Sequence, residues 1–204
     1  MVEFHTDHFS LPWNSSMASY VGADMTTTNT FTAVIYEGTP GVRVHRDHLR
    51  IVGTGRAELI DVVLAEVERG AGRIELCGGI GAEDAAAVRA AVGPGVRIGL
   101  TRYGFESLER IADYKRAAMA GELRPGAFLY LAPGLDPDRD RDTHTDAVFV
   151  PVPDPGAIAG VVASLSGLGL GLIELYGGLG VDAAAAAVRA SGGQIPVGFV
   201  GYDD

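Results

Sequence analysis

The stretch that decides the fold is Ile74-Glu75-Leu76-Cys77-Gly78-Gly79-Ile80-Gly81, because it returns 99 positions later as Ile173-Glu174-Leu175-Tyr176-Gly177-Gly178-Leu179-Gly180. In both places a short apolar run that carries one carboxylate ends in a glycine cluster, and an alanine-rich segment follows. This order is typical of a strand, a tight turn and a helix. The chain is therefore an internal duplication.

The duplication divides the chain into three parts. Residues 1–30 show no helical or strand period and are expected to form a flexible tail. Residues 31–121 are predicted to form a first α/β repeat and residues 122–204 a second. Matching residues are offset by 94 at the first strand and by 99 later, because the loop over residues 136–142 is longer in the second repeat.

Each repeat is predicted to contain four strands that alternate with helices. In the first repeat the strands are residues 31–37, 49–52, the apolar run that begins at Ile74 and 96–101, with helices near 59–67, 83–92 and 105–119. The run that begins at Ile74, and its copy that begins at Ile173, are called the signature strands below. In the second repeat the strands are residues 127–132, 148–151, the signature strand and 195–200, with helices near 158–162 and 182–190. The third helix of the first repeat has an apolar stripe of Phe105, Leu108, Ile111 and Ala112 and has no counterpart in the second repeat.

Alternating strands and helices favour a parallel sheet in an α/β fold, and apolar strands favour burial of both sheet faces. Two arrangements fit the pattern. The first is a pair of flavodoxin-like parallel βα repeats related by a pseudo-twofold axis. The alternative is an eight-stranded βα barrel that closes from two half-barrels. A barrel of 204 residues would be small for its class and would lack a final helix, so the paired sheets are favoured.

The composition of the chain limits the kinds of partner that it is expected to bind. The chain has 26 acidic and 16 basic residues and a net charge of −10, so nucleic acid and anionic membranes are not expected to bind. The single cysteine cannot form an internal disulfide, and residues 1–30 lack an export signal or a membrane span, so a cytoplasmic location is predicted. A small-molecule substrate is the expected partner, and homo-oligomerisation stays open.

The signature over residues 74–81, with its preceding helix and later strand, resembles a bacterial family described only as a domain of unknown function. Members of that family look like one copy of a strand, Glu-Leu-Cys-Gly-Gly and a helix. The resemblance implies that this chain is a tandem fusion of two copies after residue 30. The second copy departs from the signature with Tyr176 in place of Cys77, so no chemistry with a thiol in both copies is implied.

The signature strand places a carboxylate on an unusual face. Alternation puts Ile74 and Leu76 on one face and Arg73, Glu75 and Cys77 on the other. A carboxylate among apolar residues is costly to bury unless it is paired, hydrogen-bonded or protonated. Either Glu75 and its counterpart Glu174 fix the packing of the copies, or they share one cleft in which one is a base and the other an acid.

Further candidates collect where the parallel strands end, the edge at which ligands usually bind. Cys77 lies beside a glycine turn and a helix start, where the pKa of a thiol can fall. The glycines either admit an anion to the helix amides or simply permit a tight turn. Arg102 is expected to pair with a substrate carboxylate or with Asp203. The catalytic candidates are Glu75, Glu174, Cys77, Tyr176, Arg102 and Asp203, and the ligand-binding candidates are Gly78, Gly79, Gly81, Gly177, Gly178, Gly180, Tyr103 and Tyr202.

A second group has the composition of metal ligands, namely His45, Asp47, His48, His144 and Asp146. These residues precede a strand, whereas the glutamates lie toward the carboxyl ends of theirs, so the two groups are expected at opposite edges of a parallel sheet. No metal and no other cofactor is therefore predicted, and the tail residues His5 and His8 are weak ligand candidates.

Three functions follow from these candidates. The first is a cofactor-independent enzyme of isomerase, lyase or cyclase type that uses acid and base groups from both repeats. The second is a non-catalytic ligand-binding or assembly protein whose glutamates only join the repeats. The third is a metal-dependent hydrolase built on His45 and His144. A deep pocket that contains Glu75 and Glu174 favours the first, and carboxylates sealed in a dry interface favour the second.

Overall fold

The computed structural model describes residues 30–122 and 124–202, so the predicted tail lies almost wholly outside the described residues. The strands are β1 (Phe31–Glu37), β2 (Gly41–Arg46), β3 (Leu49–Thr54), β4 (Ala71–Cys77), β5 (Arg97–Tyr103), β6 (Gly126–Leu131), β7 (Asp142–Thr143), β8 (Ala147–Val152), β9 (Leu172–Tyr176) and β10 (Val197–Tyr202). The α-helices are α1 (Leu59–Glu68), α2 (Ala82–Val92), α3 (Leu108–Met119), α4 (Ile158–Ser164) and α5 (Val181–Ala190). Short 3-10 turns are η1 (Arg56–Glu58), η2 (Phe105–Ser107), η3 (Pro155–Ala157) and η4 (Ser166–Leu168).

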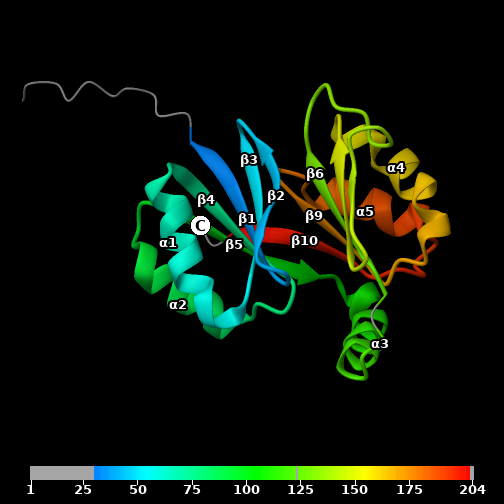
Figure 1. Cartoon of the computed structure of the whole chain (residues 1–204). Helices are drawn as coiled ribbons and strands as arrows, with labels where there is room; N and C mark the ends of the chain where they lie inside the picture. Colours follow the sequence, from blue (N-terminus) through cyan, green and yellow to red (C-terminus); the bar gives the residue numbers. More distant parts are fainter. Residues whose placement is uncertain (1–29, 123, 203–204) are drawn as a thin grey trace, which may run out of the picture.

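The described strands form one ten-stranded sheet in the order β2-β3-β1-β4-β5-β10-β9-β6-β8-β7. Strands β3, β1, β4 and β5 are parallel to one another, and so are β8, β6, β9 and β10. The two sets meet where β5 pairs antiparallel with β10, and β2 and β7 add antiparallel strands at the outer edges. The result is a mixed α/β fold whose sheet is nearly barrel-shaped (Figure 1).

The predicted alternation of strands and helices is confirmed, but the way the two sets join is not the predicted one. They do not form two separate sheets, because the last strand of each set hydrogen-bonds to the last strand of the other. The eight-stranded βα barrel is also wrong, since such a barrel is parallel throughout and β5 and β10 run antiparallel. The edge strands β2 and β7 were not predicted, and His45, which was expected only to precede a strand, lies on β2 itself.

Each set of parallel strands carries its helices on one face. Helix α1 links β3 to β4 and α2 links β4 to β5, so the chain advances in one direction across the sheet. Right-handed crossovers that advance in one direction place both helices on the same side. Helices α4 and α5 follow the same course in the second set, and Figure 1 shows the two helix pairs on opposite sides of the molecule.

The faces that carry no helices bury each other in the centre of the molecule. The apolar cluster between them contains Tyr36, Phe128, Phe149 and Tyr176, whose ring centroids lie 5.2 to 6.0 Å apart in the four contacting pairs. Buried aromatic pairs add about 0.5–1.5 kcal/mol each beyond their buried area. Both faces of the sheet are therefore buried, as the apolar strands predict.

Helix α3 differs from the other helices. It lies at the bottom of the view in Figure 1, below the junction of the two sets, and buries none of its residues fully. Of the stripe identified in the sequence, only Ile111 is half-buried, and Phe105 is 90% exposed. Within the described part of the chain, no helix combines the length and the apolar character needed to cross a membrane.

Candidate functional site

Glu75 lies in the middle of β4 and points into the centre of the molecule, with a side chain that is closed off from solvent. Only 1% of the surface of Glu75 is exposed. The backbone N–H of Gly177 donates to Oε2 at 2.9 Å, and the hydroxyl of Tyr202 donates to Oε1 at 2.5 Å. Both donors belong to the second repeat, so this carboxylate binds across the junction.

Glu174 makes the reciprocal contacts from β9 and is also 1% exposed. It accepts hydrogen bonds from the hydroxyl of Tyr103 and from the backbone N–H of Gly78, both in the first repeat. The hydroxyl of Tyr176, two residues along the same strand, is a third donor. The pairs Gly78 and Gly177, and Tyr103 and Tyr202, are each 99 positions apart, so the duplication repeats the contact as well as the sequence.

Local backbone geometry makes these contacts possible. Gly78 and Gly177 have φ angles of 70° and 64°, a region that residues with a Cβ atom rarely adopt. The tyrosine rings need room as well. A Cβ at Gly99 would lie 3.0 Å from the Tyr202 ring, and a Cβ at Gly198 would lie 3.0 Å from the Tyr103 ring. Glycines at the strand pair β5–β10 therefore let each ring reach the glutamate beyond it.

The electrostatics of the two carboxyls follow from their burial. Burial raises the pKa of Glu75, and the hydrogen bonds from Tyr202 and Gly177 oppose this in part. Burial likewise raises the pKa of Glu174 against the hydrogen bonds from Tyr103, Tyr176 and Gly78. The pKa values therefore move in the same direction, whereas an acid and base pair needs them to move apart.

Cys77 lies next to this cluster, on the same face of β4 as Glu75. Its thiol donates to the carbonyl of Ile35 at 3.5 Å and is within hydrogen-bonding reach of the Tyr176 hydroxyl. Burial, followed by the negative charge of Glu174, raises the pKa of the thiol well above its usual value. This direction is opposite to the one expected from its place beside a helix start, because burial outweighs the helix.

The glycine turns themselves are mostly exposed at the surface. Gly81 donates its backbone N–H to Asp84 at 3.0 Å, which caps α2 with the helix's own carboxylate. Arg56 donates to the carbonyl of Gly79 at 2.5 Å and lies 3.3 Å from Asp84. The start of α2 is thus already occupied by a carboxylate. In the second repeat, Gly178 and Gly180 are exposed, and Asp182 lies in the first helical turn of α5.

The remaining predicted residues do not join the glutamates. Arg102 is exposed, and its side chain crosses β10 so closely that a Cβ at Gly201 would lie 2.8 Å from Nε. Asp203 lies outside the described residues. Arg97, which was not predicted to take part, lies over the Tyr202 ring at 4.8 Å from its centroid.

The histidines are also placed apart from the glutamates. A ring nitrogen of His144 is 2.9 Å from Asp142, and one of His48 is 3.1 Å from the carbonyl of Leu131. In residues 30–122 and 124–202, no three His, Cys, Asp or Glu side chains come together as a metal site. His5 and His8 lie outside that part of the chain.

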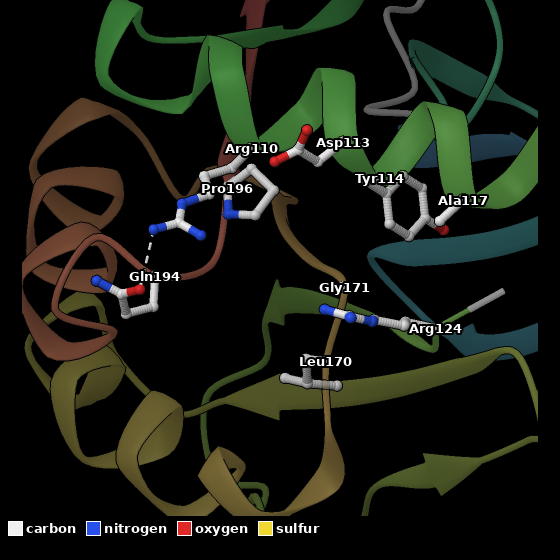
Figure 2. A pocket seen from close by; sticks show the side chains of 9 residues that line it. All are labelled: Arg110, Asp113, Tyr114, Ala117, Arg124, Leu170, Gly171, Gln194 and Pro196. Atoms are coloured by element: carbon white, nitrogen blue, oxygen red, sulfur yellow. Dashed lines mark hydrogen bonds between the residues drawn. The ribbon is translucent and has the colours of Figure 1, made fainter. Parts of the chain in front are cut away.

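A pocket of about 250 Å³ lies between α3 and the segments that enter β6, β9 and β10. Figure 2 shows its lining: Arg110, Asp113, Tyr114, Ala117, Arg124, Leu170, Gly171, Gln194 and Pro196. Arg110 donates to the side-chain oxygen of Gln194 at 3.0 Å. Gly171 is needed here, because a Cβ would lie 2.6 Å from the Tyr114 ring. No sequence pattern predicts this pocket, since its residues come from separate segments without a shared motif.

The pocket borders the buried cluster. Burial raises the pKa of Tyr114, and the negative charges of Glu174 and Asp146 raise it further. The pKa of Tyr103 is raised by burial and by Glu174, with a smaller effect from Tyr114. The phenol of Tyr114 therefore lies within electrostatic range of the Tyr103–Glu174 pair.

Comparisons with known proteins bear mainly on the family. No curated protein matches the chain. Among solved structures, an extracellular ligand-binding receptor from Verminephrobacter eiseniae ef01-2 is similar at 11% identity and a TM-score of 0.27, over 82% of this chain and 63% of the receptor's chain. The model of a family of unknown function (DUF6506) matches residues 42–116 and again residues 125–204, each inside one predicted repeat. The chain therefore belongs to this family of unknown function, as a tandem duplication of its domain.

Proposed function

We propose that this chain is a ligand-binding protein, that the pocket beneath α3 is its binding site, and that its ligand is a small carboxylate. The observation that carries the proposal is the convergence of Arg110, Arg124 and Gln194 on one pocket of about 250 Å³. Glu75 and Glu174 are 1% exposed and accept hydrogen bonds across the junction, which suits a role in joining the repeats.

The chemistry of the lining suits an anion. Arginine presents a planar set of donors that matches a carboxylate in a bidentate arrangement. Arg110 already uses one nitrogen on Gln194, whereas Arg124 has no hydrogen bond or ion pair with another described residue. Asp113 is the acidic residue of the lining, and it pairs with Arg116. Two guanidinium groups in a chain of net charge −10 form a local positive site that attracts an anion.

The volume restricts the ligand to a small molecule. Pockets for drug-sized ligands start at roughly 300 Å³, so a pocket of about 250 Å³ suits a metabolite of a few carbon atoms. Leu170, Ala117 and the Tyr114 ring supply an apolar wall for its carbon skeleton.

The test is calorimetric titration of the full chain with acetate, succinate, citrate and inorganic phosphate. We expect Arg124→Gln to weaken binding of the best carboxylate by about 10- to 100-fold, since a charge-assisted hydrogen bond contributes about 1.5–3 kcal/mol. Arg139→Gln is the matched control, because its side chain is 72% exposed and pairs only with Asp140 among the described residues. Equal binding by the two variants, or no binding of any carboxylate, would contradict the proposal.

A second candidate, the acid–base enzyme, is supported by the position of Tyr114. The pKa of this phenol is raised by burial and then by Glu174, so a pocket side chain is linked to the buried carboxylate. In an isomerase, lyase or cyclase, Tyr114 would face the substrate, with Tyr103 and Glu174 positioned behind it.

Tyr114→Phe separates the two candidates. If the chain is an enzyme, this variant should lose at least about 100-fold in kcat on a substrate that it still binds, because general acid or base groups contribute roughly 10²–10⁴-fold. If the chain only binds its ligand, the substitution should leave affinity within a few-fold of the parent and no turnover should exist to lose. Product formation followed by NMR on each ligand identified above provides the measurement.

We further propose a flavodoxin-like origin for each repeat and a cytoplasmic location. Numbered by their order in each repeat, the four parallel strands are arranged second, first, third, fourth, which matches the flavodoxin-like order as far as it extends. The cytoplasmic location rests on Cys77, the one cysteine of the chain, which is buried with a free thiol.

A further inference from the structure

Helix α3 presents apolar side chains to solvent on the side that faces away from the molecule. Phe105 is 90% exposed, Leu108 48% and Met119 80%, and Ala112 is exposed between them. Residues three apart eclipse in a 3-10 turn, so Phe105 of η2 lies on the same side as Leu108. The opposite side of α3 carries the half-buried residues Ile111, Tyr114, Ala117 and Ala118, which contact the rest of the chain.

The spacing of the exposed stripe is that of a helix seam. Phe105, Ala112 and Met119 lie seven residues apart, with Leu108 between the first two and Lys115 at the equivalent place between the last two. A helix of this length is marginal by itself in water, and α3 buries none of its residues fully. The stripe is therefore an uncovered packing surface and not an ordinary solvated helix face.

The charged residues on either side of Ala112 determine which partner can pack against this surface. Glu106 and Glu109 lie in the first half of the segment, and Lys115 and Arg116 lie in the second half. A second α3 that runs antiparallel and crosses at Ala112 would place Glu109 beside Arg116 of the other copy, on the same flank of the helix pair, and Phe105 against Met119. Each of these contacts would occur twice about the twofold axis, as in an isologous interface.

From this self-complementarity we infer that α3 is a dimerisation helix and that its partner is the α3 of a second copy of this chain. An interface built on one helix from each copy lies at the small end of specific interfaces, below roughly 1,200 Å². We therefore expect a reversible dimer that dissociates at about 1 to 100 µM. The pocket residues Arg110 and Tyr114 need no part in this interface, so the inference is independent of the proposed ligand.

The experiment is sedimentation velocity of the full chain over about 1 to 500 µM, with charge exchanges on α3. Glu109→Lys and Arg116→Glu should each weaken the dimer by at least about 10-fold, because like charges then meet in both contacts. The double variant E109K/R116E should restore the dissociation constant to within about threefold of the parent. Arg139→Glu, a charge reversal on the loop before β7, is the control and should change nothing.

Two other outcomes would contradict the proposed dimer. A chain that stays monomeric over the whole range overturns the inference and leaves the stripe to a different partner. A dimer that survives Glu109→Lys and Met119→Asp unchanged overturns it as well, because another surface then holds the copies together. Circular dichroism of each variant establishes that the helix content of the chain is unchanged when the association is measured.

Discussion

Glu174→Ala is expected to lower the free energy of unfolding by about 3–5 kcal/mol, a large share of the roughly 5–15 kcal/mol that holds a typical domain. The substitution leaves three donors without an acceptor in the interior, namely the hydroxyls of Tyr103 and Tyr176 and the N–H of Gly78. Each buried unsatisfied donor costs about 1–3 kcal/mol, and loss of the buried charge offsets part of the total. Urea unfolding followed by circular dichroism measures the difference.

Two further variants make the result specific. Glu75→Ala should cost less, because Glu75 has two donors, Tyr202 and the N–H of Gly177, where Glu174 has three. Glu68→Ala at the exposed end of α1 is the control and should stay within about 0.5 kcal/mol of the parent. A cost below about 1 kcal/mol for Glu174→Ala would mean that the buried carboxylate does not hold the repeats together.

Folding stability should fall as the pH rises from about 4.5 toward neutral, which is the reverse of the usual behaviour of carboxyl groups. Burial raises the pKa of Glu75 and Glu174, so the folded chain keeps protons that the unfolded chain releases near its pKa of about 4.3. The stabilisation is complete below that value. It is lost at about 1.4 kcal/mol per pH unit for each group until the folded-state pKa is passed, after which stability becomes constant.

The double variant E75Q/E174Q isolates this effect, since glutamine does not titrate. Asp136 and Asp140 have pKa values lowered by backbone or arginine hydrogen bonds, so they act below about pH 4 and do not interfere. Unfolding by urea at intervals from pH 4.5 to 8 should give a downward slope for the parent that is absent in the double variant. Equal slopes would show that both glutamates ionise in the folded chain as freely as in the unfolded one.

The alternation in the signature strand was enough to predict which side chains share a face. Ile74 and Leu76 pack under the helices, while Glu75 and Cys77 face the other half of the sheet, as a period of two requires. The edge strands were missed for a physical reason. Edge positions accept polar and charged side chains, so the segment that contains His45 has the composition of a loop.

The hydrogen-bond partners of the glutamates were beyond sequence reasoning. The donors to Glu75 are 102 and 127 positions away, and they reach it only because β5 and β10 join the two halves into one curved sheet. Tyr103 and Tyr202 were predicted at a ligand edge, but the pairing of those strands turns them inward to the carboxylates. The pocket beneath α3 depends on how a helix packs on three distant segments, which no local pattern records.

The difference between Cys77 and Tyr176 has an evolutionary consequence. A chain with one copy of the domain could complete these contacts only by pairing with an identical chain, and symmetry would then give both carboxylates the same neighbours. Fusion of the copies in one gene removes that constraint. Glu174 has a third donor in Tyr176, whereas Glu75 has a thiol at the equivalent place. The tandem gene thus allows each half to specialise while the ancestral contact is kept.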